Sequence, residues 1–111
     1  MLVVDDDEDL RDSVAYVLRD EGYEVQTAAN GKEALALLDT MPPPSVVLLD
    51  LMMPVMNGWR TLEAIRERGH APPVVVVSAS VPPSPDGATA YLRKPLDVDT
   101  LLAQVNAVLQ P

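Results

Sequence analysis

Short apolar runs alternate along the chain with longer segments in which apolar residues recur every three or four positions. The runs within residues 2–4, 45–50 and 74–78 are rich in valine and leucine, and each ends at a polar residue. Apolar runs of this length are typical of strands that are buried on both faces of a sheet. We therefore expect each run to cross the interior and to end in a polar group.

Four segments show the spacing of amphipathic helices. They are residues 8–20, a stretch that begins after Asn30-Gly31, residues 59–68, and the chain from Asp97 onwards. Asp7 or Asp9 is expected to cap the first helix, and Gly22 to close it. The apolar residues expected on the inner faces are Leu10, Val14, Val17, Leu18, Ala34, Leu35, Leu37, Leu38, Leu62, Ile65, Val98, Leu101, Leu102, Val105, Val108 and Leu109.

Two further strands complete the alternation. Residues 23–28 alternate apolar and polar side chains, and residues 90–92 form a short last strand. Strands that alternate with helices predict one α/β domain over residues 1–111, with a parallel sheet covered on both faces. Right-handed crossovers favour a flavodoxin-like, doubly wound sheet of five strands in the order 2-1-3-4-5.

The segment between the fourth and fifth strands is short for a helix. Residues 79–89 include Pro82, Pro83, Pro85 and Gly87. An average helix takes about 11 residues, and a proline in its interior costs about 3 kcal/mol. We therefore expect the fourth helix of the fold to be absent or reduced to a turn.

Composition excludes several classes of site. The chain has 111 residues, no cysteine and a single histidine, so disulfides, cysteine zinc sites and multi-histidine sites are excluded. A formal charge of −9 argues against direct binding of nucleic acid. No apolar run approaches the roughly 18 residues of a membrane span, and no signal peptide opens the chain. We expect a cytoplasmic domain without membrane contact.

Polar side chains end the strands of the predicted sheet. In such sheets, ligands bind at the carboxyl ends of the strands, near the switch point between strands 1 and 3. The side chains expected there are Asp5 and Asp6, Asp50, Ser78 and Lys94. Singly, each has an ordinary explanation as a helix cap, a loop residue or a turn residue. Their convergence at one edge predicts a single site.

The chemistry that suits this set is phosphoryl transfer to a carboxylate. Oxygen ligands without histidine or cysteine favour Mg²⁺ or Mn²⁺. Lys94 offsets the negative charge that remains, and the Ser78 hydroxyl can donate a hydrogen bond to a phosphoryl oxygen. Asp50 ends the central strand and is the predicted acceptor.

In these residues the chain resembles the receiver domain of response regulators in two-component signalling, of the chemotaxis-regulator kind. The motifs that carry the resemblance are Val3-Val4-Asp5-Asp6, Leu48-Leu49-Asp50 followed by Pro54 and Gly58, Ser78-Ala79, and Lys94-Pro95. The resemblance implies that Asp50 takes a phosphoryl group from a sensor histidine kinase or a histidine-phosphotransfer protein. It also implies that the protein is a phosphoprotein of a phosphorelay and that two copies can form a homodimer on phosphorylation.

The resemblance also implies a metal site and a switch. Asp6 and Asp50 would bind Mg²⁺ directly together with the backbone carbonyl of Met52, and Asp5 would act mostly through water. Ser78 and Lys94 would hold the phosphoryl group, and the Lys94–Pro95 peptide bond would be cis. Tyr91 matches the switch aromatic, which turns inward when the serine moves towards the phosphate.

Other functional classes fit the residues less well. A phosphorylation-independent interaction module stays open because of the proline-rich segment 79–89. An aspartyl phosphohydrolase would need a second acid two residues after Asp50, where the chain has Met52. A nucleotide or flavin domain lacks its glycine-rich loop after the first strand. We expect a signalling domain without external turnover, either stand-alone or part of a longer protein.

Overall fold

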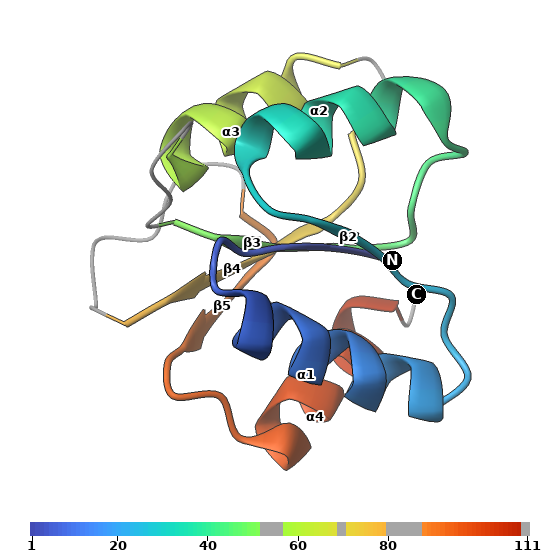
Figure 1. Ribbon diagram of the computed structural model, residues 1–111, viewed down its shortest axis with the longest axis vertical. Coiled ribbons are helices and arrows are strands. Elements are labelled where there is room, and N and C mark those ends of the chain that lie inside the picture. Colours follow the sequence, from blue (N-terminus) through green and yellow to red (C-terminus); the bar gives the residue numbers. More distant parts are fainter. Residues whose placement is uncertain (52–56, 69–70, 80–87, 110–111) are drawn as a thin grey trace.

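A five-stranded parallel sheet with strand order β2-β1-β3-β4-β5 forms the centre of the molecule (Figure 1). The computed structural model describes residues 1–51, 57–68, 71–79 and 88–109. The strands are β1 (Leu2–Val4), β2 (Gln26–Ala28), β3 (Val47–Asp50), β4 (Val74–Ser78) and β5 (Ala90–Arg93). The helices are α1 (Glu8–Asp20), α2 (Gly31–Thr40), α3 (Gly58–Arg66) and α4 (Val98–Leu109). The predicted fold class and strand order are confirmed.

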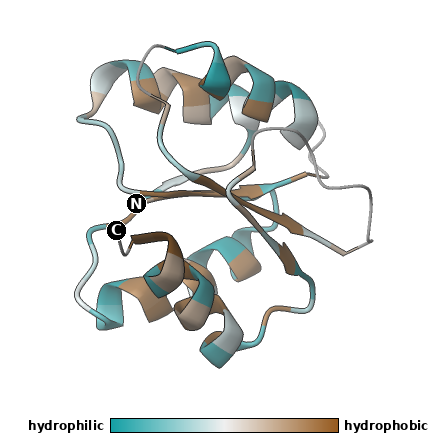
Figure 2. Cartoon of the chain, turned by 180° about the vertical axis from the view of Figure 1, so that it is seen from behind, coloured by the Kyte–Doolittle hydropathy of each residue, from teal (hydrophilic) through white to brown (hydrophobic). Residues whose placement is uncertain are grey.

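Side chains of the strands alternate between two core clusters, one on each face of the sheet. The first cluster packs under α1 and α4, and its strand residues are Val3, Leu48, Val75, Val77 and Leu92. The second packs under α2 and α3, and its strand residues are Leu2, Val4, Ala28, Val47, Leu49, Val74 and Val76. Figure 2 shows the hydrophobic colouring concentrated on the sheet and on the helix faces turned towards it. The central strands are thus buried on both faces, as their apolar runs predict.

Helix α1 has the bounds that its spacing predicts. Its N-cap is Asp7, whose side chain accepts a hydrogen bond from the Leu10 amide at 3.2 Å. Gly22 follows the helix with a φ of 96°, a left-handed conformation that residues with a Cβ rarely adopt. Val14 and Leu18 are buried as predicted.

Strand β2 is shorter than predicted. It begins at Gln26, whereas the alternation suggested a start at Tyr23. Two of the three residues before it bond the end of α1: the Tyr23 amide donates to Leu18 O, and Arg19 donates to Val25 O at 2.8 Å. The start of the strand is therefore determined by the closure of α1, a local effect that alternation does not reveal.

Helix α4 buries a narrower face than predicted. Leu101 and Val105 are buried, but Val98 is 48% exposed. Asp97 precedes the helix and accepts a hydrogen bond from the Thr100 amide at 3.1 Å. Val98 is thus the first residue of the helix, and it is exposed because only the later turns contact the core cluster. None of the helices in the described residues is long and apolar enough to span a membrane.

The predicted lack of a helix between β4 and β5 concerns mostly residues 80–87, which lie outside the described residues. Ala79, Ala88 and Thr89, which flank them, are not helical. Thr89 joins β5 to the start of β4, since its amide donates to Val74 O at 2.8 Å. The absence or shortening of a helix between β4 and β5 therefore stays a prediction for residues 80–87.

Replacing the N-cap of α2 should destabilise the fold by a modest amount. The Asn30 side chain accepts a hydrogen bond from the Glu33 amide at 2.9 Å. Asn30→Ala leaves that donor to water and is expected to lower the free energy of unfolding by about 1 kcal/mol. Urea denaturation measures the change, and Asn30→Asp, which keeps the acceptor, serves as the control. An unchanged free energy in Asn30→Ala would show that the cap contributes nothing.

Candidate functional site

The register of the parallel strands brings the predicted polar residues to one edge of the sheet. Val4 pairs with Leu49, so the residues that follow them, Asp5 and Asp50, lie at the same level on neighbouring strands. On the next strand, Ser78 lies one residue beyond Val77, the partner of Asp50. Lys94 follows β5, and its amide donates to Ser78 O at 2.8 Å. The strands therefore deliver all of these groups to their carboxyl ends.

Three carboxylates form a compact cluster at this edge. One oxygen each of Asp5, Asp6 and Asp50 lies within 4.8 Å of the others. The Lys94 ammonium lies 3.3 Å from Asp5 Oδ2 and 3.5 Å from Asp50 Oδ2. Lys94 thus reaches across β4 and β3 to hold two of the carboxylates, and it supplies the positive charge that balances them in part.

The acids differ in their surroundings. Asp50 is 3% exposed and Asp5 is 5% exposed, whereas Asp6 is exposed to solvent. The Asp5 carboxylate has partners at both oxygens, because Oδ1 accepts from the Asp7 amide at 2.9 Å and Oδ2 faces Lys94. Buried carboxylates are retained in proteins only when such partners compensate for the loss of hydration. The site is therefore built around two buried acids and an open one.

Strand alternation places the two buried acids, Asp5 and Asp50, on one side of the sheet. Asp5 and Asp50 line a small cavity with Val14, Leu48 and Val77, all members of the core cluster under α1 and α4. Because side chains alternate along a strand, Asp50 belongs to the same face of the sheet as Leu48, two residues earlier. By the same rule, Ser78 belongs to the face of Val76, on the other side of the sheet.

Ser78 and Tyr91 both belong to the side of the sheet covered by α2 and α3. Ser78 is 1% exposed, and Tyr91 is half-buried against the second core cluster. The Lys94–Pro95 peptide bond is cis, as predicted. Met52 lies outside the described residues. The structure thus brings Asp5, Asp6, Asp50 and Lys94 together, and places Ser78 at the same edge.

Two features of the main chain around the site were not predicted from the sequence. Arg11, on α1, donates from Nη1 to Asp5 O at 3.0 Å. Arg11 stands between Leu10 and Asp12 in the predicted helix, and this position indicates only a side chain at the surface. At Gly58, a Cβ would lie 2.5 Å from Asp50 O and closer still to Leu51 Cα, so this backbone approach requires glycine.

The donor set fits a small hard cation. All three side chains offer carboxylate oxygens, the ligands that Mg²⁺ prefers. Ligands on opposite sides of one Mg²⁺ lie about 4.2 Å apart. The separation of up to 4.8 Å is therefore close to the size of a Mg²⁺ coordination shell.

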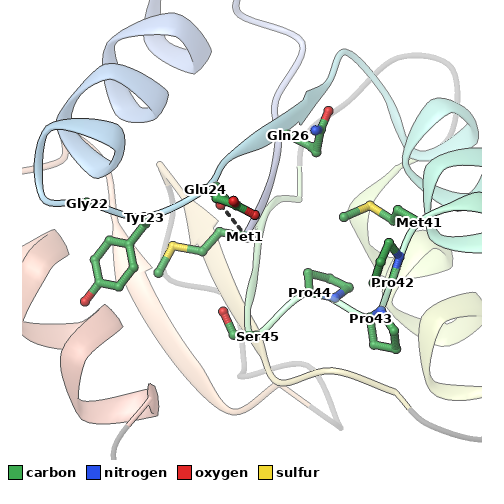
Figure 3. A pocket seen from close by; sticks show the side chains of 10 residues that line it. All are labelled: Met1, Gly22, Tyr23, Glu24, Gln26, Met41, Pro42, Pro43, Pro44 and Ser45. Atoms are coloured by element: carbon green, nitrogen blue, oxygen red, sulfur yellow. Dashed lines mark hydrogen bonds between the residues drawn. The ribbon is translucent and has the colours of Figure 1, made fainter.

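A larger pocket lies at the opposite edge of the sheet (Figure 3). It measures about 510 Å³ and is lined by residues around the amino ends of the strands, including Met1, Tyr23, Glu24 and Met41. The Met1 amino group donates to Glu24 O at 2.7 Å; burial lowers its pKa below the usual 8.0, and the Glu24 carboxylate opposes that shift. This pocket contains none of the clustered carboxylates, and it is separate from the candidate site.

Known proteins resemble this chain in both sequence and fold. The family model for the response regulator receiver domain matches residues 1–106. The response regulator MprA of Mycolicibacterium vanbaalenii is 39% identical over 116 residues, which cover 99% of this chain and 50% of that protein. The sensory transduction protein RegX3 of Mycobacterium tuberculosis is 36% identical over 115 residues, with the same coverage. The chain therefore spans about half the length of these curated relatives.

Solved structures agree with the sequence comparison. The chemotaxis protein CheY4 of Vibrio cholerae superposes with a TM-score of 0.91 and 36% identity, covering 97% of this chain and 96% of that one. The response regulator TrrA of Thermotoga maritima, solved in complex with Mg²⁺ and BeF, gives a TM-score of 0.88 and 31% identity over the same shares of the two chains. From the family match, the sequence relatives and the shared fold, we conclude that this chain belongs to the response regulator receiver domain family of two-component signalling.

Proposed function

We propose that Asp50 is the phosphoacceptor of this receiver domain and that a divalent cation, Mg²⁺ or Mn²⁺, assists the transfer. The observation that carries the proposal is the position of Lys94, whose ammonium lies within 3.5 Å of two carboxylates of a three-carboxylate cluster. A carboxylate nucleophile needs positive charge close by when its negative charge grows on phosphorylation. Lys94 and a bound cation supply that charge together.

The transfer is a substitution at phosphorus. A carboxylate oxygen of Asp50 attacks the phosphorus of a phosphohistidine on a sensor histidine kinase or a phosphotransfer protein. The new O–P bond makes an acyl phosphate, the P–N bond breaks, and the histidine nitrogen leaves with the electron pair. Lys94 Nζ and the Ser78 hydroxyl then donate hydrogen bonds to the phosphoryl oxygens. When bound, the cation neutralises charge on those oxygens.

The burial of the acids supports a division of roles among them. Asp6 is exposed and can turn towards a cation, whereas both oxygens of Asp5 already have partners. We infer that Asp6 and Asp50 bind the cation directly, with the main-chain carbonyl of Met52, and that Asp5 acts through water. Tyr91, on the side of the sheet to which Ser78 belongs, is the proposed switch residue.

Intact mass spectrometry with a small phosphodonor tests this function. The wild-type protein, incubated with acetyl phosphate and Mg²⁺, is expected to gain the mass of one phosphoryl group. Asp50→Asn, which keeps the size of the side chain but removes the nucleophile, is expected to gain none. A wild-type protein that stays unmodified, or an Asp50→Asn protein modified as efficiently as wild type, would remove the proposal and favour a phosphorylation-independent interaction module.

A further inference from the structure

The peptide group between Asp5 and Asp6 is held by a side chain from α1. Arg11 Nη1 donates to Asp5 O at 3.0 Å. The peptide unit is planar, so this carbonyl and the Asp6 amide turn as one body. A bond to the carbonyl therefore limits the direction in which the Asp6 side chain leaves the backbone. Arg11 is half-buried, and it belongs to a helix whose own position is fixed by the buried Val14 and Leu18.

Other bonds fix the rest of Asp5. Its amide donates to Ala28 O at 3.1 Å on β2, and its Oδ1 accepts from the Asp7 amide at 2.9 Å. These contacts anchor Asp5, but Asp6 is exposed and follows the end of the strand. The Arg11 bond differs from them because it acts on the peptide group that joins the buried acid to the open one.

From this geometry, we propose that Arg11 is a positioning residue, which orients Asp6 for the cation through the Asp5–Asp6 peptide group. The role of Lys94 differs, because its ammonium touches the carboxylates themselves and competes with a cation for them. Arg11 binds a main-chain carbonyl and can stay in place when a cation binds. Partners of this kind, one step removed from a metal ligand, typically change metal affinity about 10- to 100-fold when they are removed.

The sign of the effect separates positioning from simple charge. Arg11 is a cation beside three acids, so its removal makes the site more negative. If charge were its only contribution, Arg11→Ala would bind Mg²⁺ more tightly. If Arg11 orients Asp6, the same substitution weakens Mg²⁺ binding, because the ligand must then be ordered when the cation binds.

Arg19 provides a matched control on the same helix. It also donates from its guanidinium to a main-chain carbonyl, Val25 O at 2.8 Å, but at the far end of α1 from the acids. Arg19→Ala removes the same charge and the same kind of bond. Any loss of affinity that comes from a weakened α1 or from the net charge of the chain will therefore appear in both variants.

Two measurements on the 111-residue protein test the proposal, which rests on the proposed function for its metal. Trp59 follows Gly58 on α3, next to the site, and its fluorescence can report a titration with Mg²⁺. The dissociation constant should be about 10-fold higher in Arg11→Ala and unchanged in Arg19→Ala. Arg11→Lys, which keeps the charge and a donor, should recover part of the loss. In the metal-free protein, hydrogen exchange of the Asp6 and Asp7 amides should be faster in Arg11→Ala than in wild type.

The outcomes distinguish this proposal from the function it serves. Unchanged or tighter Mg²⁺ binding in Arg11→Ala, or amide exchange equal to wild type, overturns the positioning role. If wild type itself binds no Mg²⁺, the proposed metal-assisted function fails. Hydrogen exchange in the metal-free protein then still decides whether Arg11 orders the main chain at Asp6 and Asp7.

Discussion

Replacing Lys94 with alanine is expected to slow phosphorylation of Asp50 about 100-fold, the usual effect of removing one preorganised donor from a site of developing negative charge. The Lys94 ammonium lies 3.3 Å and 3.5 Å from two buried carboxylates. Without it, phosphoryl oxygens at Asp50 lose a charged donor. The rate is measured from the growth of the phosphorylated mass with acetyl phosphate and Mg²⁺.

The same variant should bind Mg²⁺ at least as tightly as wild type. Lys94 competes with a cation for Asp5 and Asp50, and its removal leaves these buried acids without their compensating charge. The metal-free variant should therefore melt at a lower temperature than wild type, and added Mg²⁺ should restore much of the difference.

Arg93→Ala is the matched control for Lys94→Ala. It removes the same charge one residue earlier, at an exposed position on β5. Its phosphorylation rate and Mg²⁺ affinity are expected to equal those of wild type. Equal slowing in the two variants would attribute the effect to net charge and contradict a specific role for Lys94.

Substituting alanine for Gly58 is expected to damage both stability and phosphorylation. The added Cβ would meet main-chain atoms of Asp50 and Leu51, which cannot rotate away as a side chain can. The backbone around the acceptor must therefore shift, and overpacking of this kind costs about 1–3 kcal/mol. Because Asp50 O lies at the point of collision, phosphorylation should slow even in protein that remains folded.

Gly22→Ala separates the two effects of Gly58→Ala. Nothing lies within 4 Å of a Cβ at Gly22, but its φ of 96° makes a side chain there costly, by about 1–2 kcal/mol. Urea denaturation should thus show a loss of stability in both variants, and phosphorylation of folded protein should change only in Gly58→Ala. A Gly58→Ala protein phosphorylated at the wild-type rate would show that the loop adapts without moving Asp50.

The fold was predictable because its three central strands, β1, β3 and β4, are almost entirely apolar. Runs such as Val74–Ser78 have one plausible place, the buried centre of a parallel sheet, and the order of elements then restricts the topology. The same topology predicted that Asp5, Asp50 and Lys94 would meet, since parallel strands end together.

Features decided by single tertiary contacts were not predictable. The alternation from Tyr23 suggested a longer β2, but the Tyr23 amide bonds Leu18 O at the end of α1 instead, and its hydroxyl bonds Asn106 Oδ1 at 2.7 Å, a partner 83 residues away. Val98 matches the apolar face of α4 in spacing, yet it precedes the part of the helix that reaches the core. The bond from Arg11 to a backbone carbonyl has no sequence signature, because every residue carries such an acceptor.

The alternation of side chains across the sheet divides the proposed site between the two core layers. The buried acids Asp5 and Asp50 lie on the side covered by α1 and α4, while Ser78 and Tyr91 belong to the side covered by α2 and α3. A phosphoryl group on Asp50 that also bonds Ser78, as proposed, would join the two layers. A substitution in either core layer is therefore expected to alter phosphorylation.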